Sequence, residues 1–307
     1  MNIIVCFRQD IRVSPVQAYS HSYVKELKKL GHKVETIGEG HDFNDLYQYI
    51  LLSSRPYDLV LEIDNGRNIN GSLSLQVPNL QREKLTQFQT AVIFIDSHGH
   101  PDLHKDLAPK YDHVFFAVWD KRDLFKDHKS AHWCPNITDF EWFGREKFQE
   151  ELVFDFGFFG SKKGLIRAEP LLRIGERREW RVDVREVVKP RRHRWPETGR
   201  VMSRCHVLYN RGQKHDGPNQ RVLESMACGR PLLNDLDSRS GMDRLFQNGI
   251  HYLGYDPNNE FDLEEKMKFL LHNPVVALDM AERAYQEVLT KHTAKNRVQQ
   301  ILEVVCK

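Results

Sequence analysis

Two acidic residues with seven residues between them carry the clearest chemistry in this sequence. Asp216 lies in a polar stretch, and Glu224 follows Pro218 in a segment whose apolar residues recur at helical spacing. A proline is favourable at the beginning of a helix, because its missing N–H would be unpaired there. Carboxylates accept hydrogen bonds from hydroxyl groups, and a helix N-terminus attracts phosphate. The pair therefore suits a ligand that combines sugar hydroxyls with a diphosphate.

The residues around Glu224 predict a short helix followed by a buried strand. The apolar face of the helix consists of Val222, Leu223, Met226 and Ala227. Gly229 can adopt the left-handed conformation that ends a helix, and the apolar run after it predicts the strand. Arg221 and Glu224 lie one turn apart on another face, where we expect them to be free to meet a ligand.

This stretch resembles the donor-binding segment of GT-B glycosyltransferases, and in particular the spore-maturation-type branch of the group 1 glycosyl transferases. The resemblance rests on Pro218-Asn219-Gln220-Arg221-Val222-Leu223-Glu224, Ala227-Cys228-Gly229 and Pro231-Leu232-Leu233. It implies a nucleoside-diphosphate sugar as donor, with Glu224 on the ribose and Asp216 on the sugar. It also implies that Asn219 or Arg221 contacts a phosphate or a sugar hydroxyl. Asp216 is an aspartate where many relatives have glutamate.

Two basic segments are candidates for holding the donor diphosphate. Gly160-Ser161-Lys162-Lys163-Gly164 lies between a predicted strand and a predicted helix, so that Gly160, Ser161 and Lys163 could bind phosphate oxygens. Arg191 lies in the basic loop of residues 189–200, where a guanidinium could bind phosphate in a bidentate way. Asn210, at the end of a strand, is expected near the donor. For both basic segments the alternative is a surface that faces water.

The first half of the chain offers Asp96-Ser97-His98-Gly99-His100 at the end of its most apolar strand. Open parallel sheets present catalytic side chains at such strand ends. We expect Asp96, His98 or His100 to lie at the cleft and to bind the sugar or act as a base, with Asp96 and His98 as the preferred candidates. One alternative is that Asp96 caps the next helix, and another is a divalent-metal site. The resemblance to GT-B enzymes implies no bound metal and no cofactor besides the donor substrate.

Composition limits the class of protein. The 307 residues are 40% hydrophobic and 29% charged, with a net charge of +2, as in a globular protein of two domains. No apolar run approaches the length of a membrane span, and the five cysteines are scattered, which favours a reducing cytoplasm. Residues 161–214 hold 16 Lys/Arg against 6 Asp/Glu, a surplus of ten that implies an anionic partner.

Strand and helix patterns alternate along both halves, which predicts α/β architecture: two Rossmann-like domains with parallel sheets that face each other across a cleft, as in GT-B. We place an acceptor-side domain at residues 1–145 and a nucleotide-sugar-binding domain at residues 152–290. Residues 291–307 are expected to form a helix that crosses back to the first domain.

The sequence thus predicts a glycosyltransferase, and the acidic pair favours retention of the anomeric configuration. The acceptor is left open. One alternative keeps the fold but glycosylates a modified DNA base, as viral-type enzymes do, because the basic surplus would suit a nucleic acid. Another alternative is a non-catalytic module that binds nucleotide sugars. A serine hydrolase and a Rossmann dehydrogenase are disfavoured, because neither G-x-S-x-G nor G-x-G-x-x-G is present.

Overall fold

The structure is a computed structural model of the whole chain. It describes residues 1–7, 15–38, 41–42, 46–53, 55–64, 88–148, 150–160, 166–186, 195–212, 218–237 and 239–307. The contacts divide the chain into two compact units: unit 1 comprises Met1–Asn136 with Ala294–Lys307, and unit 2 comprises Ile137–Thr293.

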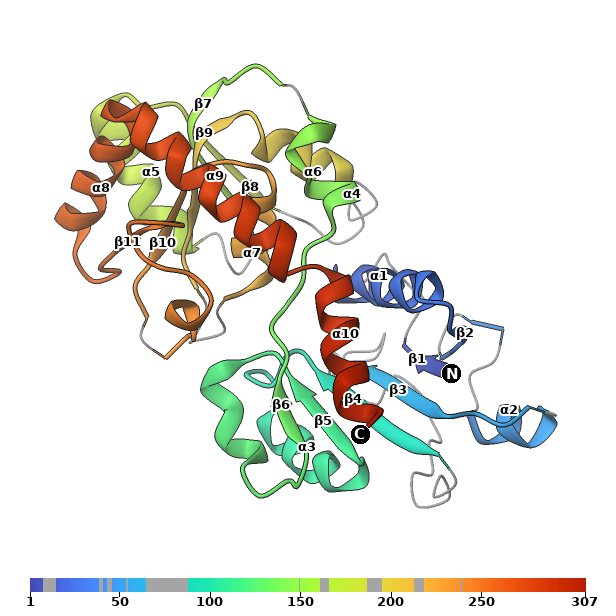
Figure 1. The fold of residues 1–307 in the computed structure, drawn as a ribbon. Coiled ribbons are helices and arrows are strands. Elements are labelled where there is room, and N and C mark those ends of the chain that lie inside the picture. The colour runs from blue at the N-terminus through green and yellow to red at the C-terminus, as the bar shows by residue number, and fades with distance from the viewer. Residues whose placement is uncertain are drawn as a thin grey trace. The chain divides into compact units, whose positions relative to one another are not determined.

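Unit 1 is built around a parallel sheet with strand order β2-β1-β3-β4-β5-β6 among the described residues. The strands are β1 (Asn2–Cys6), β2 (Lys33–Ile37), β3 (Leu59–Asp64), β4 (Gln89–Phe94), β5 (His113–Phe116) and β6 (Ala131–Trp133). Its helices are α1 (Pro15–Lys29), α2 (Leu46–Leu52), α3 (Pro101–Leu107) and α10 (Ala294–Val305), with 3-10 turns η2 (Ala108–Lys110) and η3 (Trp119–Phe125). Strands β1, β4 and β5 are buried along nearly all of their length, as is typical of a parallel sheet covered by helices, whereas β2 is mostly half-buried. In Figure 1, α10 lies beside α1, and the two helices pack on each other.

Unit 2 contains a second parallel sheet, with strand order β11-β10-β9-β7-β8 in its described part. The strands are β7 (Phe154–Gly160), β8 (Val182–Glu186), β9 (Cys205–Asn210), β10 (Leu232–Asp235) and β11 (Leu253–Tyr255). The helices are α4 (Phe140–Phe143), α5 (Glu169–Arg178), α6 (Trp195–Met202), α7 (Gln220–Ala227), α8 (Glu260–His272) and α9 (Pro274–Lys291), with η4 (Arg145–Lys147) and η6 (Met242–Arg244). All described strand pairs in both units are parallel, which confirms the predicted fold class.

Two helices differ from the sequence expectations. The basic loop was expected to extend from residue 189 to 200, but α6 begins at Trp195. Pro196 is compatible with the first turn, and Val201 and Met202 bury their side chains. Helix α3 was given no predicted bounds; it is the helix that Asp96 was considered to cap, but its N-cap residue is His100, without a capping side-chain hydrogen bond. It begins at Pro101 and buries His104 and Leu107.

Residues 137–148 belong to unit 2, whereas the sequence analysis drew the domain boundary between residues 145 and 152. Helix α4 is capped by the side chain of Asp139, which accepts a hydrogen bond from the Glu141 N–H at 2.8 Å. The helix contacts α6 and α7. Arg145 forms a bidentate pair with Glu282 on α9 and lies over the ring of Tyr285, 3.9 Å from its centroid. These contacts fix the segment to the helices of unit 2.

The core of unit 2 includes two buried tyrosines beneath the carboxyl end of the sheet. Tyr255 donates its hydroxyl hydrogen to the Tyr209 hydroxyl at 2.9 Å, and Tyr209 donates to the carbonyl of Arg167 at 3.1 Å. Both polar groups are therefore satisfied inside an apolar cluster. Burial raises the pKa of Tyr209 to about 12, so both phenols stay neutral and serve packing.

A charged cluster joins α5 to α8. Glu264 accepts hydrogen bonds from Arg177 and Arg178, and Lys268 lies 3.1 Å from one of its oxygens. The hydrogen bond from Arg178, and then those from Lys268 and Arg177, lower the pKa of Glu264 to about 2, although burial acts in the opposite direction. The carboxylate is 5% exposed, whereas the guanidinium groups reach water.

Glu264→Gln is expected to lower the free energy of unfolding at pH 7 by about 1–2 kcal/mol, a value reduced for the solvent around the arginines. Because the folded pKa lies below the unfolded one, the stabilisation by Glu264 is complete above the unfolded pKa near 4.5. It is lost as the pH falls toward the folded pKa of about 2. Urea titrations between pH 7 and 3 should show the two proteins converging. Glu265→Gln, at an exposed neighbour, is the control, and equal stability of Glu264→Gln and parent at pH 7 would refute the role.

Candidate functional site

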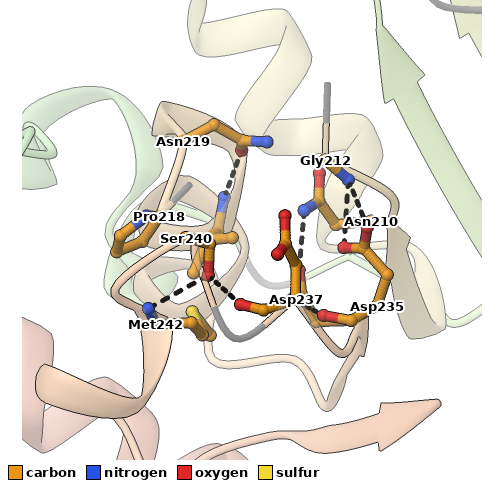
Figure 2. A pocket seen from close by; sticks show the side chains of 10 residues that line it. Asn210, Gly212, Pro218, Asn219, Asp235, Asp237, Ser240 and Met242 are labelled. Atoms are coloured by element: carbon orange, nitrogen blue, oxygen red, sulfur yellow. Dashed lines mark hydrogen bonds between the residues drawn. The ribbon is translucent and has the colours of Figure 1, made fainter. Parts of the chain in front are cut away.

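A pocket lies in unit 2 where the carboxyl ends of β9 and β10 meet the N-terminus of α7 (Figure 2). Open parallel sheets bind ligands at this edge, because the loops that leave the strands diverge there. The residues that line the pocket are Asn210, Gly212, Pro218, Asn219, Val222, Asn234, Asp235, Asp237, Ser240 and Met242. Most of its polar groups are amides or carboxylates, which suit hydroxyl-bearing ligands.

A hydrogen bond between two asparagine side chains joins the ends of β9 and β10 at the base of the pocket. Asn210 and Asn234 are register partners on β9 and β10, and both are nearly fully buried. The Asn210 amide donates to Asn234 Oδ1 at 2.6 Å, and the Asn234 amide donates to the Asp235 carbonyl at 2.7 Å. Each bond satisfies a buried polar group that would otherwise be costly. The side chains are therefore held in fixed orientations.

Asp235 extends this arrangement to the chain beyond β9. Both of its carboxylate oxygens lie 3.0 Å from the Gly212 N–H, which donates to them. Figure 2 shows Asp235 reaching from the end of β10 to Gly212. A hydrogen bond to an ionised acceptor is stronger than a neutral one, so Asp235 fixes the path of the chain as it leaves β9.

Helix α7 begins at this pocket. Asn219 has extended backbone angles, φ −73° and ψ 169°, and its side-chain oxygen accepts from the Val222 N–H at 3.3 Å. The predicted apolar face of Val222, Leu223, Met226 and Ala227 is fully buried. With that face anchored, the N-terminus of α7 points its positive end at the pocket, where it would attract an anionic group.

The loop after β10 closes another side of the pocket. Asp237 accepts a hydrogen bond from the Arg239 N–H at 3.0 Å, and its carbonyl accepts from the Ser240 hydroxyl at 2.8 Å. The Ser240 oxygen in turn accepts from the Met242 N–H at 3.1 Å. Gly241, with φ 77°, has the left-handed conformation that this tight turn requires. In Figure 2 the Asp237 carboxylate projects into the space between Ser240 and Asn210.

Arg221 and Glu224 lie one turn apart on α7, as expected, but they contact each other. Arg221 Nη1 lies 2.6 Å from Glu224 Oε2, and the Glu224 side chain is 3% exposed. Arg221 also reaches the sulfur of Met202 at 3.5 Å. The sequence could not show this pair, because its orientation depends on α6 packing beside α7. Neither residue lines the pocket as it stands.

In unit 1, Asp96 and His98 follow β4 at the carboxyl edge of that sheet. The Asp96 carbonyl accepts from the Gly99 N–H at 2.9 Å and closes a turn. The turn is anchored by Ser97, whose hydroxyl lies 3.0 Å from His104 Nδ1, with both side chains fully buried. His98 is half-buried, and its Nδ1 lies inside without a hydrogen-bond partner among the described residues. Such a nitrogen is available to a ligand hydroxyl.

The structure brings Asn210 and Asn219 together in the pocket, while Gly160 ends β7 in the same sheet. Ser161, Lys163, Arg191 and Asp216 lie outside the described residues. Sequence reasoning missed the polar residues at and after the carboxyl end of β10, namely Asn234, Asp235, Asp237 and Ser240. The signal available for them was the change from Leu232-Leu233 to a polar run, which marks the carboxyl end of a buried strand.

The described residues include neither a cluster of metal ligands nor a membrane-spanning helix. No three or more His, Cys, Asp or Glu side chains gather there in a way that would hold a metal ion. None of the described helices is both long and apolar enough to cross a membrane.

A model of the glycosyl transferase-like family matches residues 145–303, which is more than half of the chain. The chain belongs to this family. The match confirms the resemblance on which the sequence analysis relied, and the protein is a glycosyltransferase. No curated protein sequence matches it.

Solved structures place the glycosyltransferase in the GT-B fold. An alpha-glucosyltransferase in complex with UDP and a 13-mer DNA containing an HMU base is similar over all of both chains, with TM-score 0.70 and 12% identity. Sucrose-phosphate synthase from Thermosynechococcus elongatus matches with TM-score 0.68 and 11% identity, over 99% of this chain and 98% of the other. Anabaena Alr3699/HepE in complex with UDP matches with TM-score 0.58 and 11% identity over all of both chains.

Asn219→Ala in the glycosyltransferase should lower the free energy of unfolding by about 1 kcal/mol, because the first turn of α7 loses its cap. Urea denaturation would measure the loss. Asn219→Asp keeps an oxygen at the cap and should retain the stability of the parent. Asn259→Ala removes a comparable cap from α8, where Asn259 accepts from the Phe261 and Asp262 N–H groups at 3.1 and 3.2 Å. Similar losses in both alanine variants are expected, and an unchanged Asn219→Ala would contradict the capping role.

Proposed function

We propose that the glycosyltransferase takes a sugar from a nucleoside diphosphate, with UDP as the nucleotide, and that unit 2 binds this donor. The observation that carries the proposal is the pocket at the carboxyl ends of β9 and β10. There the positive N-terminus of α7 adjoins the fixed amides and carboxylates of Asn210, Asn234 and Asp235. The complexes of the similar alpha-glucosyltransferase and HepE with UDP support the choice of nucleotide.

Glu224 is proposed to bind the ribose. Arg221 already holds its carboxylate at 2.6 Å, so the ribose hydroxyls would meet an acceptor of fixed orientation. The diphosphate is assigned to the α7 N-terminus, to Gly160, Ser161 and Lys163, and to Arg191. Asp216 and Asn219 are assigned to the sugar. These assignments rest on the family motif and on the place of the described residues in the sheet.

The proposed reaction retains the anomeric configuration. The bond between the anomeric carbon and the diphosphate oxygen breaks, a bond to the acceptor oxygen forms on the same face, and the acceptor proton passes to the leaving diphosphate. Positive groups at the α7 N-terminus would stabilise the negative charge that develops on the leaving group. Unit 1 is proposed to bind the acceptor through Asp96 and His98. No cofactor is needed in this scheme.

UDP should raise the melting temperature of the protein, because a ligand that binds only the folded state stabilises it, by about 2.7 kcal/mol at 100 times its Kd. Differential scanning fluorimetry with UDP, ADP and GDP would measure the shift. Glu224→Gln is expected to reduce the UDP shift by at least half, while Glu264→Gln, an acid of unit 2 outside the pocket, should keep it. Absence of a shift with all three nucleotides would refute the donor site. Binding without turnover of any UDP-sugar would indicate the non-catalytic module.

A second candidate acceptor is a modified base in DNA. Several described arginines of residues 161–214 already pair with acids, among them Arg181 with Asp155 and Arg200 with Glu150. Other basic residues of this range lie in three stretches, residues 161–165, 187–194 and 213–217, in which Asp216 is the single acid. A sequence with this surplus of positive charge suits a phosphate backbone. The similar alpha-glucosyltransferase is in complex with DNA, which favours this acceptor.

If DNA is the acceptor, the protein should bind duplex DNA with an affinity that falls steeply with salt, with a log–log slope of about −3 or steeper. Gel shifts of duplexes with and without hydroxymethylated pyrimidines at 50 to 300 mM salt would measure it. A variant with Arg191, Arg192 and Arg194 all changed to Ser should lose most of the slope. Arg173→Ser, whose parent arginine pairs with Glu260, is the control. Absence of binding at low salt would favour a small acceptor.

A cytoplasmic location is also proposed. None of the five cysteines forms a disulfide bond, and four of them are buried. Burial raises the pKa of the Cys134 thiol to about 11 and that of Cys205 to about 12, which leaves both unreactive. A reducing compartment is compatible with thiols kept in this form.

A further inference from the structure

Four polar side chains form a hydrogen-bond network near the amino ends of β5 and β6 in unit 1. They are His113 on β5, His132 on β6, and His128 and Ser130 in the segment that precedes β6. All four are half-buried, and they lie within residues 88–148, which the structure describes without a gap. The proposed reaction involves none of them.

His128 is neutral in this network, because its partners fix its tautomer. The Tyr111 carbonyl, 3.0 Å from His128 Nε2, can only accept a hydrogen bond, so Nε2 carries the hydrogen. The Ser130 N–H, 3.2 Å from His128 Nδ1, can only donate, so Nδ1 carries none. A proton added to Nδ1 would set two donors against each other and break the bond to Ser130.

The Ser130 hydroxyl joins the other two rings. Its oxygen lies 2.8 Å from His113 Nδ1 and 3.0 Å from His132 Nε2. A hydroxyl has a single hydrogen, so with two neutral rings it donates to one nitrogen and accepts from the other. If both rings were protonated, the hydroxyl could donate to neither, and two positive charges would share one oxygen.

Burial and neighbouring positive groups make protonation of the two rings unfavourable. Burial lowers the pKa of His113, and Lys129 and the two other rings of the network lower it further. Burial also lowers the pKa of His132, with added contributions from His128 and from Lys307, which follows α10.

Asp112 acts in the opposite direction, because its negative charge would stabilise a protonated His113. Its carboxylate already accepts hydrogen bonds from the N–H and the hydroxyl of Thr90, at 2.9 and 3.0 Å. The pKa of His113 is lowered nevertheless, so Asp112 does not offset burial and the positive neighbours.

His113 and His132 therefore stabilise the folded edge in their neutral forms. Because the folded pKa of each ring lies below the ordinary value of 6.5, an unfolded edge binds more protons than a folded one in mild acid. The stabilisation is complete above that ordinary value and is lost as the pH falls through the folded values.

Strand β6 has few other contacts with which to resist this loss. It has three residues, and it is last in the strand order of the sheet, next to β5. The Val114 N–H donates to the Ser130 carbonyl and the Cys134 N–H to the Phe116 carbonyl, both at 2.8 Å. An edge strand has such partners on one side only, so it opens more readily than a central strand.

Release of β6 would also affect the carboxyl edge of the sheet. Trp133, the last residue of β6, donates its indole N–H to the Ala117 carbonyl at 3.1 Å, and its ring lies 5.0 Å from that of Trp119. Both contacts support the segment that leaves β5, at the edge where parallel sheets bind ligands.

We infer that this histidine network is an acid-responsive device: in mild acid, between neutral pH and about pH 5, β6 detaches from β5 while the centre of the sheet stays folded. Return to neutral pH restores the strand. The inference does not depend on the donor site, because the network lies wholly in unit 1.

Hydrogen exchange of the full chain at pH 7 and pH 5, followed by mass spectrometry, is the test. Protection factors, which are corrected for the intrinsic pH dependence of exchange, should fall at least about tenfold in peptides that contain β6. They should recover when the protein is returned to pH 7. Those of β1, which lies between β2 and β3 in the same sheet, should stay within about threefold.

The triple variant His113→Asn, His128→Asn, His132→Gln replaces the rings by amides that do not titrate. Asn places a polar atom near the position of Nδ1, and Gln near that of Nε2. Its protection at β6 should change by less than about twofold between the two pH values, and that of His128→Asn alone by about threefold. His206→Gln, at an exposed histidine of β9, is the control and should behave like the parent.

Unchanged protection of β6 in the parent at pH 5 would overturn the inference. So would an equal fall in β1, because it would indicate global acid unfolding. An equal fall in the triple variant and the parent would show that the network is not the cause. If the triple variant does not fold at pH 7, His128→Asn decides: a fall as large as in the parent would overturn the inference, and the smaller fall would support it.

Discussion

The side-chain hydrogen bond between Asn210 and Asn234, at the carboxyl ends of β9 and β10, is the constraint on which the site in unit 2 depends. Two neighbouring parallel strands end in asparagines that are register partners, and their side chains bond at 2.6 Å. One residue further along β10, Asp235 holds the backbone of Gly212. Parallel strands alone would leave the two loops free to diverge. The side-chain bonds hold the loops at fixed positions, so that α7 begins beside the pocket.

Two groups of charged residues in unit 2 lie in separate regions, one between helices α5 and α8 and one in the pocket. The arginines of α5 are neutralised by Glu260 and Glu264 on α8, where they join two helices. The buried tyrosines Tyr209 and Tyr255 stay neutral beneath the sheet edge. Negative charge is concentrated at Asp235 and Asp237 in the pocket lining, next to the positive end of α7. A ligand with a neutral hydroxylated part and an anionic part matches both regions at once.

Helix α7 shows which features the sequence predicted and which it did not. Its apolar residues are buried as the spacing predicted, and the helix ends before Gly229, which has φ 65°. The charged face of the same helix was expected to be free. Instead Arg221 contacts Glu224 and the sulfur of Met202. Met202 belongs to α6, an element that the sequence analysis had assigned in part to a loop, so the contact depended on packing that a local pattern does not encode.

The sequence by itself determined the α/β class, most strands and helices, and the family. Strand runs, helical spacing and the motif from Pro218 to Leu233 are local properties, and each is expressed within a few consecutive residues. The tertiary structure alone decided that Asn234, Asp235 and Asp237 complete the pocket. Those residues lie 24 or more positions after Asn210 and meet it only because β9 and β10 are neighbours in register. Strand order is a global property, since it depends on which apolar faces pack together, and no local pattern specifies it.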